Sequence, residues 1–175
     1  MKTVFLGGSR KISRLSQPMR KRLDELMDRR FVVLVGDANG ADRAMQRYLA
    51  DSHYEAVTVF AVAPRPRNNE GQWHVEFVQP RNGAKGRELF SAKDRVMAQR
   101  ADAGLMLWDG KSKGTLDNVR DLLARGKPIA LYYAPERSFL NLKTQSDFAR
   151  VLPHLAAEDT TPLPTQADLL EERVG

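Results

Sequence analysis

Short runs of apolar residues alternate with amphipathic stretches along most of the chain. Five apolar runs predict strands at residues 3–6, 31–35, 57–62, 104–108 and 128–133. Apolar residues at helical spacing predict helices after the N-cap residue Ser16 and over about 41–49, 86–100 and 115–125. Nearly continuous apolar strands that alternate with helices are typical of a parallel sheet with both faces covered. We therefore expect an α/β fold, a Rossmann-like three-layer sandwich with a parallel sheet of about five strands.

The expected strand order indicates where a ligand would bind. In open parallel sheets, ligands bind outside the carboxyl ends of the strands, where the strand order reverses. With the common order 3-2-1-4-5, that point lies between the first and fourth strands. The segments to consider are therefore residues 7–13 and 109–115.

The segment after the first predicted strand combines glycine, hydroxyl and guanidinium groups. Gly7 and Gly8 let the backbone approach a ligand closely, Ser9 adds a hydroxyl, and Arg10 adds a forked cation. These groups predict a phosphate cradle. A tight turn followed by solvated charges explains the same residues equally well.

The segment after the fourth predicted strand leads directly into a helix. It carries Asp109, Gly110, Ser112, Gly114 and Thr115. The unpaired amides and the positive dipole end of a helix N-terminus favour phosphate, and Asp109 could accept hydrogen bonds from ribose hydroxyls. Taken alone, Thr115 is better explained as the helix N-cap. The spacings of a P-loop and of a G-x-G-x-x-G dinucleotide motif are absent.

The second predicted strand also ends in a glycine-rich turn before a helix. Gly36 and Gly40 suit a sharp strand-to-helix turn, and Asp42 suits the first helical turn. A structural role and a ligand-binding role fit these three residues equally well.

The composition limits the classes of protein to which the chain can belong. Its 175 residues and 42% hydrophobic content suit one globular domain. Without cysteine, the chain has no disulfide, thiolate metal site or cysteine nucleophile, and a reducing cytoplasm suits it. No apolar run approaches the roughly 20 residues of a membrane span. We therefore expect a soluble, cytoplasmic protein with no membrane partner.

The net charge of +6 is unevenly distributed along the chain. Residues 158–175 sum to −4, which leaves +10 for residues 1–157, because Arg173 alone balances Glu158, Asp159, Asp168, Glu171 and Glu172. We therefore expect a Rossmann-like domain over 1–157 and an acidic C-terminal tail over 158–175. The basic domain indicates an anionic partner, either a polymer or a small phosphorylated molecule.

Several ordered motifs resemble one known superfamily. They are Gly8-Ser9-Arg10, residues 36–42, residues 93–98, Ala101-Asp102 and residues 108–115. Over about residues 2–133 they are similar to the YspA-like branch of the SLOG superfamily, which includes cytokinin-activating phosphoribohydrolases, molybdenum-cofactor carrier proteins and DNA-processing protein A. The resemblance implies a Rossmann-like fold that recognises nucleotides or nucleotide-derived ligands. It implies pocket roles for Gly8, Ser9, Arg10, Gly36, Gly40, Asp42, Gly114 and Thr115.

One position argues against a direct transfer of glycosidase activity from this superfamily. The related hydrolases place a glutamate three residues after the Gly-Thr pair, where this chain has Asn118. An amide cannot act as a carboxylate nucleophile or general base. Asp109, at a strand end, is the remaining candidate catalytic residue, with Asp94 as a further carboxylate. The catalytic assignment therefore stays open.

Two other segments bear on ligands and cofactors. Residues 64–85 are long for a loop and could form a lid, in which Trp73 and His74 stack on a base or anchor the loop on the core. Lys93, on the third predicted helix, could face the carboxyl edge of the sheet or water, and a solvated face is the more common outcome. The histidines lack metal-binding spacing, so no metal site is expected, although a phosphorylated ligand could bring Mg²⁺ with it.

The favoured function is the binding or sensing of a nucleotide or nucleotide-derived ligand through phosphate-cradling loops at the carboxyl edge of the sheet. One alternative is a hydrolase that resembles the nucleotide N-glycosidases and phosphoribohydrolases. A second alternative is a single-stranded nucleic-acid binding protein, which the basic domain would suit. A homo-oligomer that pairs through apolar helix faces is compatible with the pattern.

Overall fold

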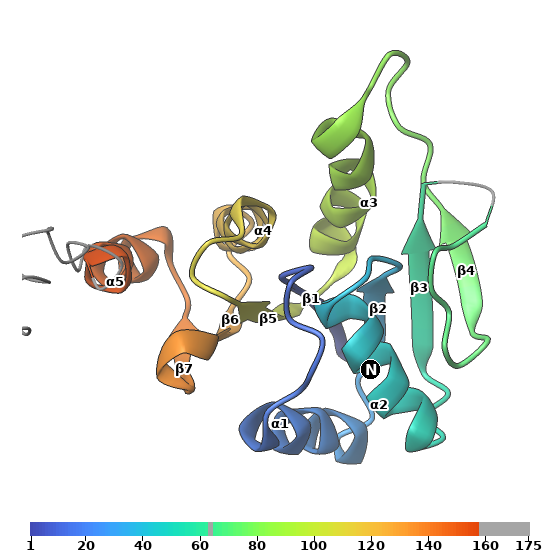
Figure 1. Cartoon of the computed structure of the whole chain (residues 1–175), viewed down its shortest axis with the longest axis horizontal. Coiled ribbons are helices and arrows are strands. Elements are labelled where there is room, and N and C mark those ends of the chain that lie inside the picture. Colours follow the sequence, from blue (N-terminus) through green and yellow to red (C-terminus); the bar gives the residue numbers. More distant parts are fainter. Residues whose placement is uncertain (63–64, 158–175) are drawn as a thin grey trace, which may run out of the picture. The chain divides into compact units, whose positions relative to one another are not determined.

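The computed structural model describes residues 1–62 and 65–157, which form an α/β fold (Figure 1). The strands are β1 (Thr3–Gly8), β2 (Val32–Gly36), β3 (Val57–Ala61), β4 (His74–Phe77), β5 (Ala103–Trp108), β6 (Ile129–Tyr133) and β7 (Ser138–Leu142). The helices are α1 (Gln17–Asp28), α2 (Ala41–Asp51), α3 (Gly86–Arg100), α4 (Lys113–Ala124) and α5 (Gln145–Ala157), with a short 3₁₀ turn at Ala134–Glu136. All five predicted strands and all four predicted helices are present.

The seven described strands form one sheet in the order β4-β3-β2-β1-β5-β6-β7. Every neighbouring pair is parallel except β6 and β7, which are antiparallel. The predicted order of the five apolar strands is confirmed, because β3, β2, β1, β5 and β6 follow one another in the sheet. The strand order therefore reverses between β1 and β5, where Leu6 pairs with Leu105.

Helices cover both faces of this sheet. In Figure 1, α1 and α2 lie on one side and α3 and α4 on the other. On the first side, Met19 and Leu23 of α1 and Met45 of α2 are fully buried against the sheet in the main apolar cluster. On the other side, Met97 of α3 and Leu122 of α4 are fully buried. The predicted sandwich follows from this burial of one stripe per helix.

Two helix N-termini show how the sequence sets the helix starts. Ser16 caps α1 as predicted, because its side chain accepts a hydrogen bond from Met19 N at 3.5 Å. The fourth helix begins earlier than predicted, at Lys113, because Ser112 rather than Thr115 is its N-cap. Thr115 lies inside the first turn, where its amide donates to Ser112 Oγ at 3.4 Å.

Two edge strands were not predicted from the apolar pattern. β4 lies inside the segment that was expected to be a long loop, and it pairs with β3. Trp73, just before β4, is 8% exposed and donates from Nε1 to Tyr54 O at 2.9 Å, so it anchors the segment on the core. β7 pairs with β6 at the opposite edge. The sheet therefore has seven strands rather than about five.

The chain divides into two compact units, residues 1–145 and residues 146–175. The described part of the second unit is nearly all of α5, which contains Pro153 and an ion pair between Arg150 and Asp147. The predicted acidic tail, 158–175, lies outside the described residues. No helix of the described chain is long and apolar enough to cross a membrane.

Candidate functional site

A pocket of about 600 Å³ lies at the carboxyl edge of the sheet, where the strand order reverses. The segments after β1 and β5 line it together with the first turns of α2, α3 and α4. Ten of the thirteen predicted site residues belong to this lining: Gly7, Gly8, Ser9, Arg10, Asp42, Asp109, Ser112, Gly114, Thr115 and Asn118. The sequence therefore identified the segments that this fold brings together.

Ser9 joins the segments that follow β1, β2 and β5. Its hydroxyl donates to Asp109 Oδ2 at 2.8 Å, and its carbonyl accepts from Ala41 N at 3.0 Å. Its own amide donates to Leu107 O at 2.9 Å, and Ser9 is 1% exposed. The amide of Ser9 is therefore committed to the sheet and cannot cradle a phosphate, which narrows the predicted role of this loop.

Asp109 holds the turn between β5 and α4. Its Oδ1 accepts hydrogen bonds from Lys111 N at 3.0 Å and Ser112 N at 2.8 Å, while Oδ2 accepts from Ser9. Burial would raise the pKa of Asp109, but these hydrogen bonds outweigh burial and hold its pKa below the ordinary value. Both oxygens are engaged, so the contacts favour a positioning role for this candidate catalytic residue.

The start of α4 presents the open backbone of the pocket. A Cβ on Gly114 would meet no atom within 4 Å, so the glycine leaves its backbone approachable without being needed for packing. Below this turn, the indole of Trp108 is buried and donates to Ser112 O at 3.2 Å. The first turn of α4 thus combines unpaired amides with a firmly supported N-cap.

Three predicted glycines lie outside the pocket lining and shape it instead. Gly40 has φ +81°, and a Cβ there would lie 2.2 Å from Arg10 O. A Cβ on Gly36 would lie 2.5 Å from both Asp42 Oδ2 and Lys93 Nζ. Gly110 has φ +85° and packs near a tyrosine ring. The structure therefore gives these three residues conformational and packing roles; for Gly36 and Gly40 such a role is one of the two that the sequence left open.

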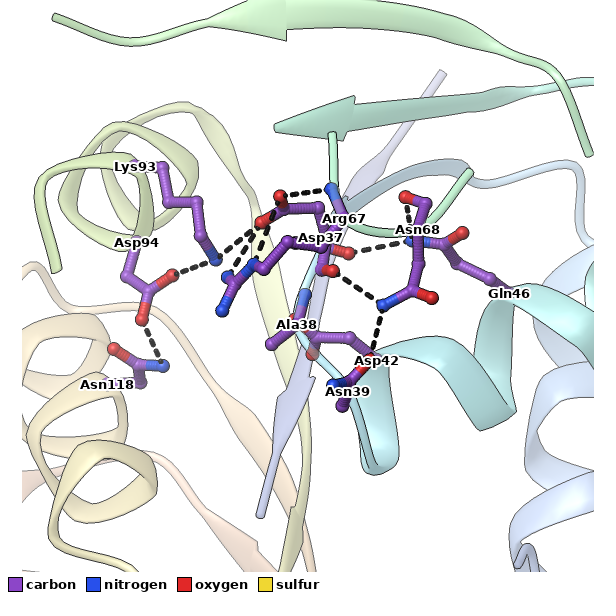
Figure 2. A network of polar contacts seen from close by, with 11 residues as sticks. Asp37, Ala38, Asn39, Asp42, Gln46, Arg67, Asn68, Lys93, Asp94 and Asn118 are labelled. Atoms are coloured by element: carbon purple, nitrogen blue, oxygen red, sulfur yellow. Dashed lines mark hydrogen bonds and ion pairs between the residues drawn. The ribbon is translucent and has the colours of Figure 1, made fainter. Parts of the chain in front are cut away.

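A network of buried charges lies beside the pocket (Figure 2). Lys93 Nζ lies 3.2 Å from Asp94 Oδ1 and 3.8 Å from Asp37 Oδ1, and Asn118 Nδ2 donates to Asp94 Oδ2 at 3.2 Å. Arg67 binds the carboxylate of Asp37 through its guanidinium, at 2.9 and 3.3 Å, and through its amide, at 2.9 Å. Opposite charges thus compensate each other across three separate segments.

These contacts shift the pKa values of Lys93 and Asp37, which are both buried. Burial would lower the pKa of Lys93, but the charges of Asp94, Asp42 and Asp37 outweigh burial and raise it. Burial would raise the pKa of Asp37, but the hydrogen bonds of Arg67 and the charge of Lys93 lower it below its ordinary value. Both groups are therefore charged at neutral pH.

Asp42 is the buried carboxylate with the least compensation. It is 7% exposed, and its Oδ2 accepts a hydrogen bond from Ala38 N at 3.3 Å. Burial raises the pKa of Asp42 to about 6; Lys93 opposes this shift, while the charges of Asp94 and Asp37 add to it. Asp42 therefore carries a charge that is costly to keep inside the fold.

Sequence reasoning missed most of the α3 residues that line the pocket, Lys93 and Phe90 among them. Lys93 is 3% exposed, so the expectation of a solvated position was wrong. Phe90 lines the pocket, and the guanidinium groups of Arg10 and Arg67 lie over its ring at 5.2 and 4.6 Å from the centroid. Phe90, Lys93 and Met97 follow helical spacing, so a lysine within an apolar stripe was the available signal.

The segment before β4 braces the site from outside the pocket. Asn68 Nδ2 donates to Asp37 O at 2.8 Å, and Gln46 Nε2 donates to Gly36 O at 2.8 Å and Asn68 O at 3.3 Å. No described residue of 65–85 belongs to the pocket lining, Trp73 and His74 included. Within the described residues, no group of three or more His, Cys, Asp or Glu side chains is placed to hold a metal ion.

Comparisons with known proteins support the fold. No protein-family model and no curated protein matches the chain. DNA processing protein A from Helicobacter pylori, for which a single-stranded DNA binding mode is described, matches with a TM-score of 0.53 and 16% identity, over 87% of this chain and 72% of that one. The same protein from Streptococcus pneumoniae matches with a TM-score of 0.54 and 18% identity, over 98% of this chain. This chain spans 61% of the length of the pneumococcal protein. At these identities the similarity shows a shared Rossmann-like fold.

Proposed function

We propose that this chain binds a nucleotide or nucleotide-derived ligand in the pocket between β1 and β5. The observation that carries the proposal is the convergence of the β1 segment, the β5 segment and the start of α4 on one pocket of about 600 Å³. This volume lies within the usual range of small-molecule sites. Sheets of this kind bind their ligands at the same topological position.

The phosphate would lie against the first turn of α4. The amides of Lys113 and Gly114, the dipole of the helix and the hydroxyl of Ser112 face that end of the pocket. Lys11 and Lys111 are exposed on the same rim and supply attraction for an anion. A Mg²⁺ ion that accompanies the phosphate is compatible with this arrangement, because the ligand would provide much of its coordination.

The opposite wall suits the base and sugar of a nucleotide. Phe90 offers an aromatic surface beside Arg10, and nucleobases stack well on both groups. Asp94 and Asn118 offer polar atoms for sugar hydroxyls. The resemblance of the motifs to the YspA-like branch of the SLOG superfamily supports the same class of ligand.

A thermal-shift screen against nucleoside mono- and diphosphates, NAD and ADP-ribose tests this proposal. A ligand at 100 times its Kd stabilises the folded state by about 2.7 kcal/mol, which shifts Tm measurably. We expect Arg10→Ala to weaken binding by about tenfold, since it removes one cation at the pocket rim. Arg20→Ala, which removes an exposed cation from α1, is the matched control and should leave affinity unchanged. Failure of every compound to raise Tm at millimolar concentration would contradict the proposal.

Single-stranded DNA binding is the second candidate. The shared fold with DNA processing protein A favours it, together with the exposed cations Lys11, Lys111 and Lys113 on the rim. A strand that neutralises several cations would bind with a steep dependence on salt and with higher affinity for longer strands. Fluorescence anisotropy with labelled strands at several salt concentrations separates this behaviour from that of a mononucleotide site.

Turnover of the ligand is the third candidate function, with Asp94 as its candidate catalytic residue. Its carboxylate lies in the pocket beside Asn118, on the helix that faces α4. Incubation with nucleoside monophosphates, followed by chromatography, would detect release of free base. Release that disappears in Asp94→Asn would replace the binding proposal with a hydrolytic one.

A further inference from the structure

We propose that the site selects phosphate groups that carry a single negative charge, as in phosphodiesters, over the dianionic phosphate of a monoester. The inference rests on the proposed function, because it concerns the anion bound in the same pocket. Two carboxylates that line the pocket, those of Asp42 and Asp109, set this selectivity.

Hydrogen bonds connect Ser9 to the elements that carry both carboxylates. The Ser9 hydroxyl donates to Asp109 Oδ2 at 2.8 Å on the β5 side. On the β2 side, the Ser9 carbonyl accepts from Ala41 N at 3.0 Å, and the next residue of α2 is Asp42. Both carboxylates line the pocket. An anion in the pocket therefore approaches two carboxylates that are negatively charged above pH 6.

Among the described residues no ion pair to either carboxylate is found, although the charge of Lys93 acts on Asp42. The hydrogen bonds to Asp109 and Asp42 come from backbone amides and from the Ser9 hydroxyl. Lys93 lies close to Asp42, but its ammonium forms ion pairs with Asp94 and Asp37. Three carboxylates of the network, those of Asp37, Asp42 and Asp94, thus share the charges of Lys93 and Arg67.

The pocket's remaining cations lie further out. Arg10, Lys11, Lys111 and Lys113 are exposed, and the guanidinium of Arg10 lies over Phe90. Solvent screens such exposed charges, whereas the buried carboxylate of Asp42 and the half-buried carboxylate of Asp109 act through a medium of lower effective dielectric constant. An extra negative charge on the ligand is therefore repelled by these carboxylates, while the attraction of the rim is screened.

The charge of Asp42 also depends on pH. The charged groups that face it are Lys93 and Asp94 of α3 and Asp37 after β2. β1 and β2, the strands against which α2 packs, contain no titratable side chain, and Arg43 of α2 pairs with Glu70. With its pKa raised to about 6, Asp42 is charged at pH 8 and is partly neutralised near pH 5.5.

Matched ligands that differ by one charge test the inference. Isothermal titration calorimetry at pH 8 would compare AMP with its phosphate methyl ester, which keeps the nucleoside and loses one negative charge. We expect the wild-type protein to bind the ester about tenfold more tightly. Asp42→Asn should reduce this ratio towards one, because the amide keeps the shape and removes the charge. Asp51→Asn, an exposed change on the same helix, should leave the ratio unchanged.

The outcomes distinguish this inference from the proposed function. If neither ligand binds, the inference falls, whereas the proposed function falls only if no compound of the thermal-shift screen raises Tm. If both ligands bind equally, or if AMP binds more tightly, only the inference falls. Asp109→Asn provides the same comparison should Asp42→Asn fail to fold, and an unchanged ratio in the folded variants would overturn the assignment of selectivity to these carboxylates.

Two further arms identify the source of the phosphodiester. A dinucleoside monophosphate contains one phosphodiester, and a longer oligonucleotide contains many. Similar affinity for both would indicate a small phosphodiester as the ligand, whereas much tighter, salt-dependent binding of the longer strand would indicate nucleic acid. Either result supports selection of monoanionic phosphate. If neither compound binds, the proposal is contradicted.

Discussion

Folding makes the carboxyl group of Asp42 a weaker acid, and this has a consequence for stability. Its folded-state pKa of about 6 exceeds the ordinary value of 3.8, so the folded state keeps a proton that the unfolded chain releases. The contribution of Asp42 is therefore fully present below pH 3.8 and is lost as pH rises through about 6. Asp42→Asn removes this loss.

We expect Asp42→Asn to be more stable relative to the wild-type protein at pH 7 than at pH 4, by on the order of 2 kcal/mol. Urea denaturation at both pH values measures the difference. Comparison with the wild type at each pH cancels the acid sensitivity of Asp37 and Asp109, whose folded pKa values are lowered. A difference that is constant between the two pH values would contradict the buried charge at this position.

The hydroxyl of Tyr132 is buried and has no hydrogen-bond partner among the described residues. An unsatisfied buried polar group destabilises the fold, so we expect Tyr132→Phe to raise the free energy of unfolding by about 1 kcal/mol. Tyr54→Phe is the matched control, since the Tyr54 hydroxyl donates to Phe31 O at 2.5 Å and its loss should lower stability. Thermal unfolding of both variants compares them, and a lower Tm for Tyr132→Phe would show that its hydroxyl is satisfied.

Alanine substitutions at Gly40 and Gly83 separate the cost of backbone strain from the cost of a steric clash with a neighbouring atom. Both have φ +81°, so alanine at either position costs roughly 1–2 kcal/mol of backbone strain. A Cβ at Gly40 would also collide with Arg10 O at 2.2 Å, whereas Gly83 has open space around it. We therefore expect Gly40→Ala to lower Tm clearly more than Gly83→Ala does. Equal losses in thermal unfolding would mean that the contact with Arg10 relaxes freely.

At the scale of elements, two serine caps differ only in their relation to the pocket. Ser16 caps α1 and Ser112 caps α4, and each accepts from an amide of the first turn. Replacement of either by alanine should cost about 1 kcal/mol of stability. Only Ser112→Ala should also weaken nucleotide binding, because of these two helices only α4 begins at the pocket. Urea denaturation and calorimetry on both variants measure the two effects, and equal affinities would remove the start of α4 from the site.

The sheet core and the position of the pocket could be predicted because they depend on local patterns. The apolar runs that form β1, β2, β3, β5 and β6 are nearly continuous. The order of these strands fixes the point at which the strand order reverses. β4 and β7 escaped prediction because their residues are mostly half-exposed, so their apolar pattern is weak. Edge strands bury less surface and therefore show less periodicity.

The roles of individual site residues could be predicted less well, since they depend on partners far along the chain. The environment of Lys93 is created by Asp37 and Asp42, more than fifty residues earlier. Gly40 is required by a carbonyl of the β1 segment, thirty residues before it. Ser112 was recognised as a pocket residue, but its capping role depended on where α4 begins. Such contacts leave no periodic trace in the sequence.

At the scale of the whole molecule, net charge is a poor guide to the site. The chain carries +6 overall, yet the pocket lining contains four aspartates beside its six lysines and arginines. One of those cations, Lys93, is already paired with carboxylates, and Arg87 forms an ion pair with Asp117. The net charge of the chain and the balance of charges that line the pocket are thus separate properties of this fold.

The hydrogen bond between Ser9 and Asp109 joins residues that are 100 positions apart. During synthesis from the N-terminus, β1 can pair with β2 early, but its other edge has no partner until β5 has left the ribosome. At about 5–20 residues per second, that edge stays open for several seconds or more. The central strand, usually the best protected part of a sheet, therefore has an open pairing edge for that part of synthesis.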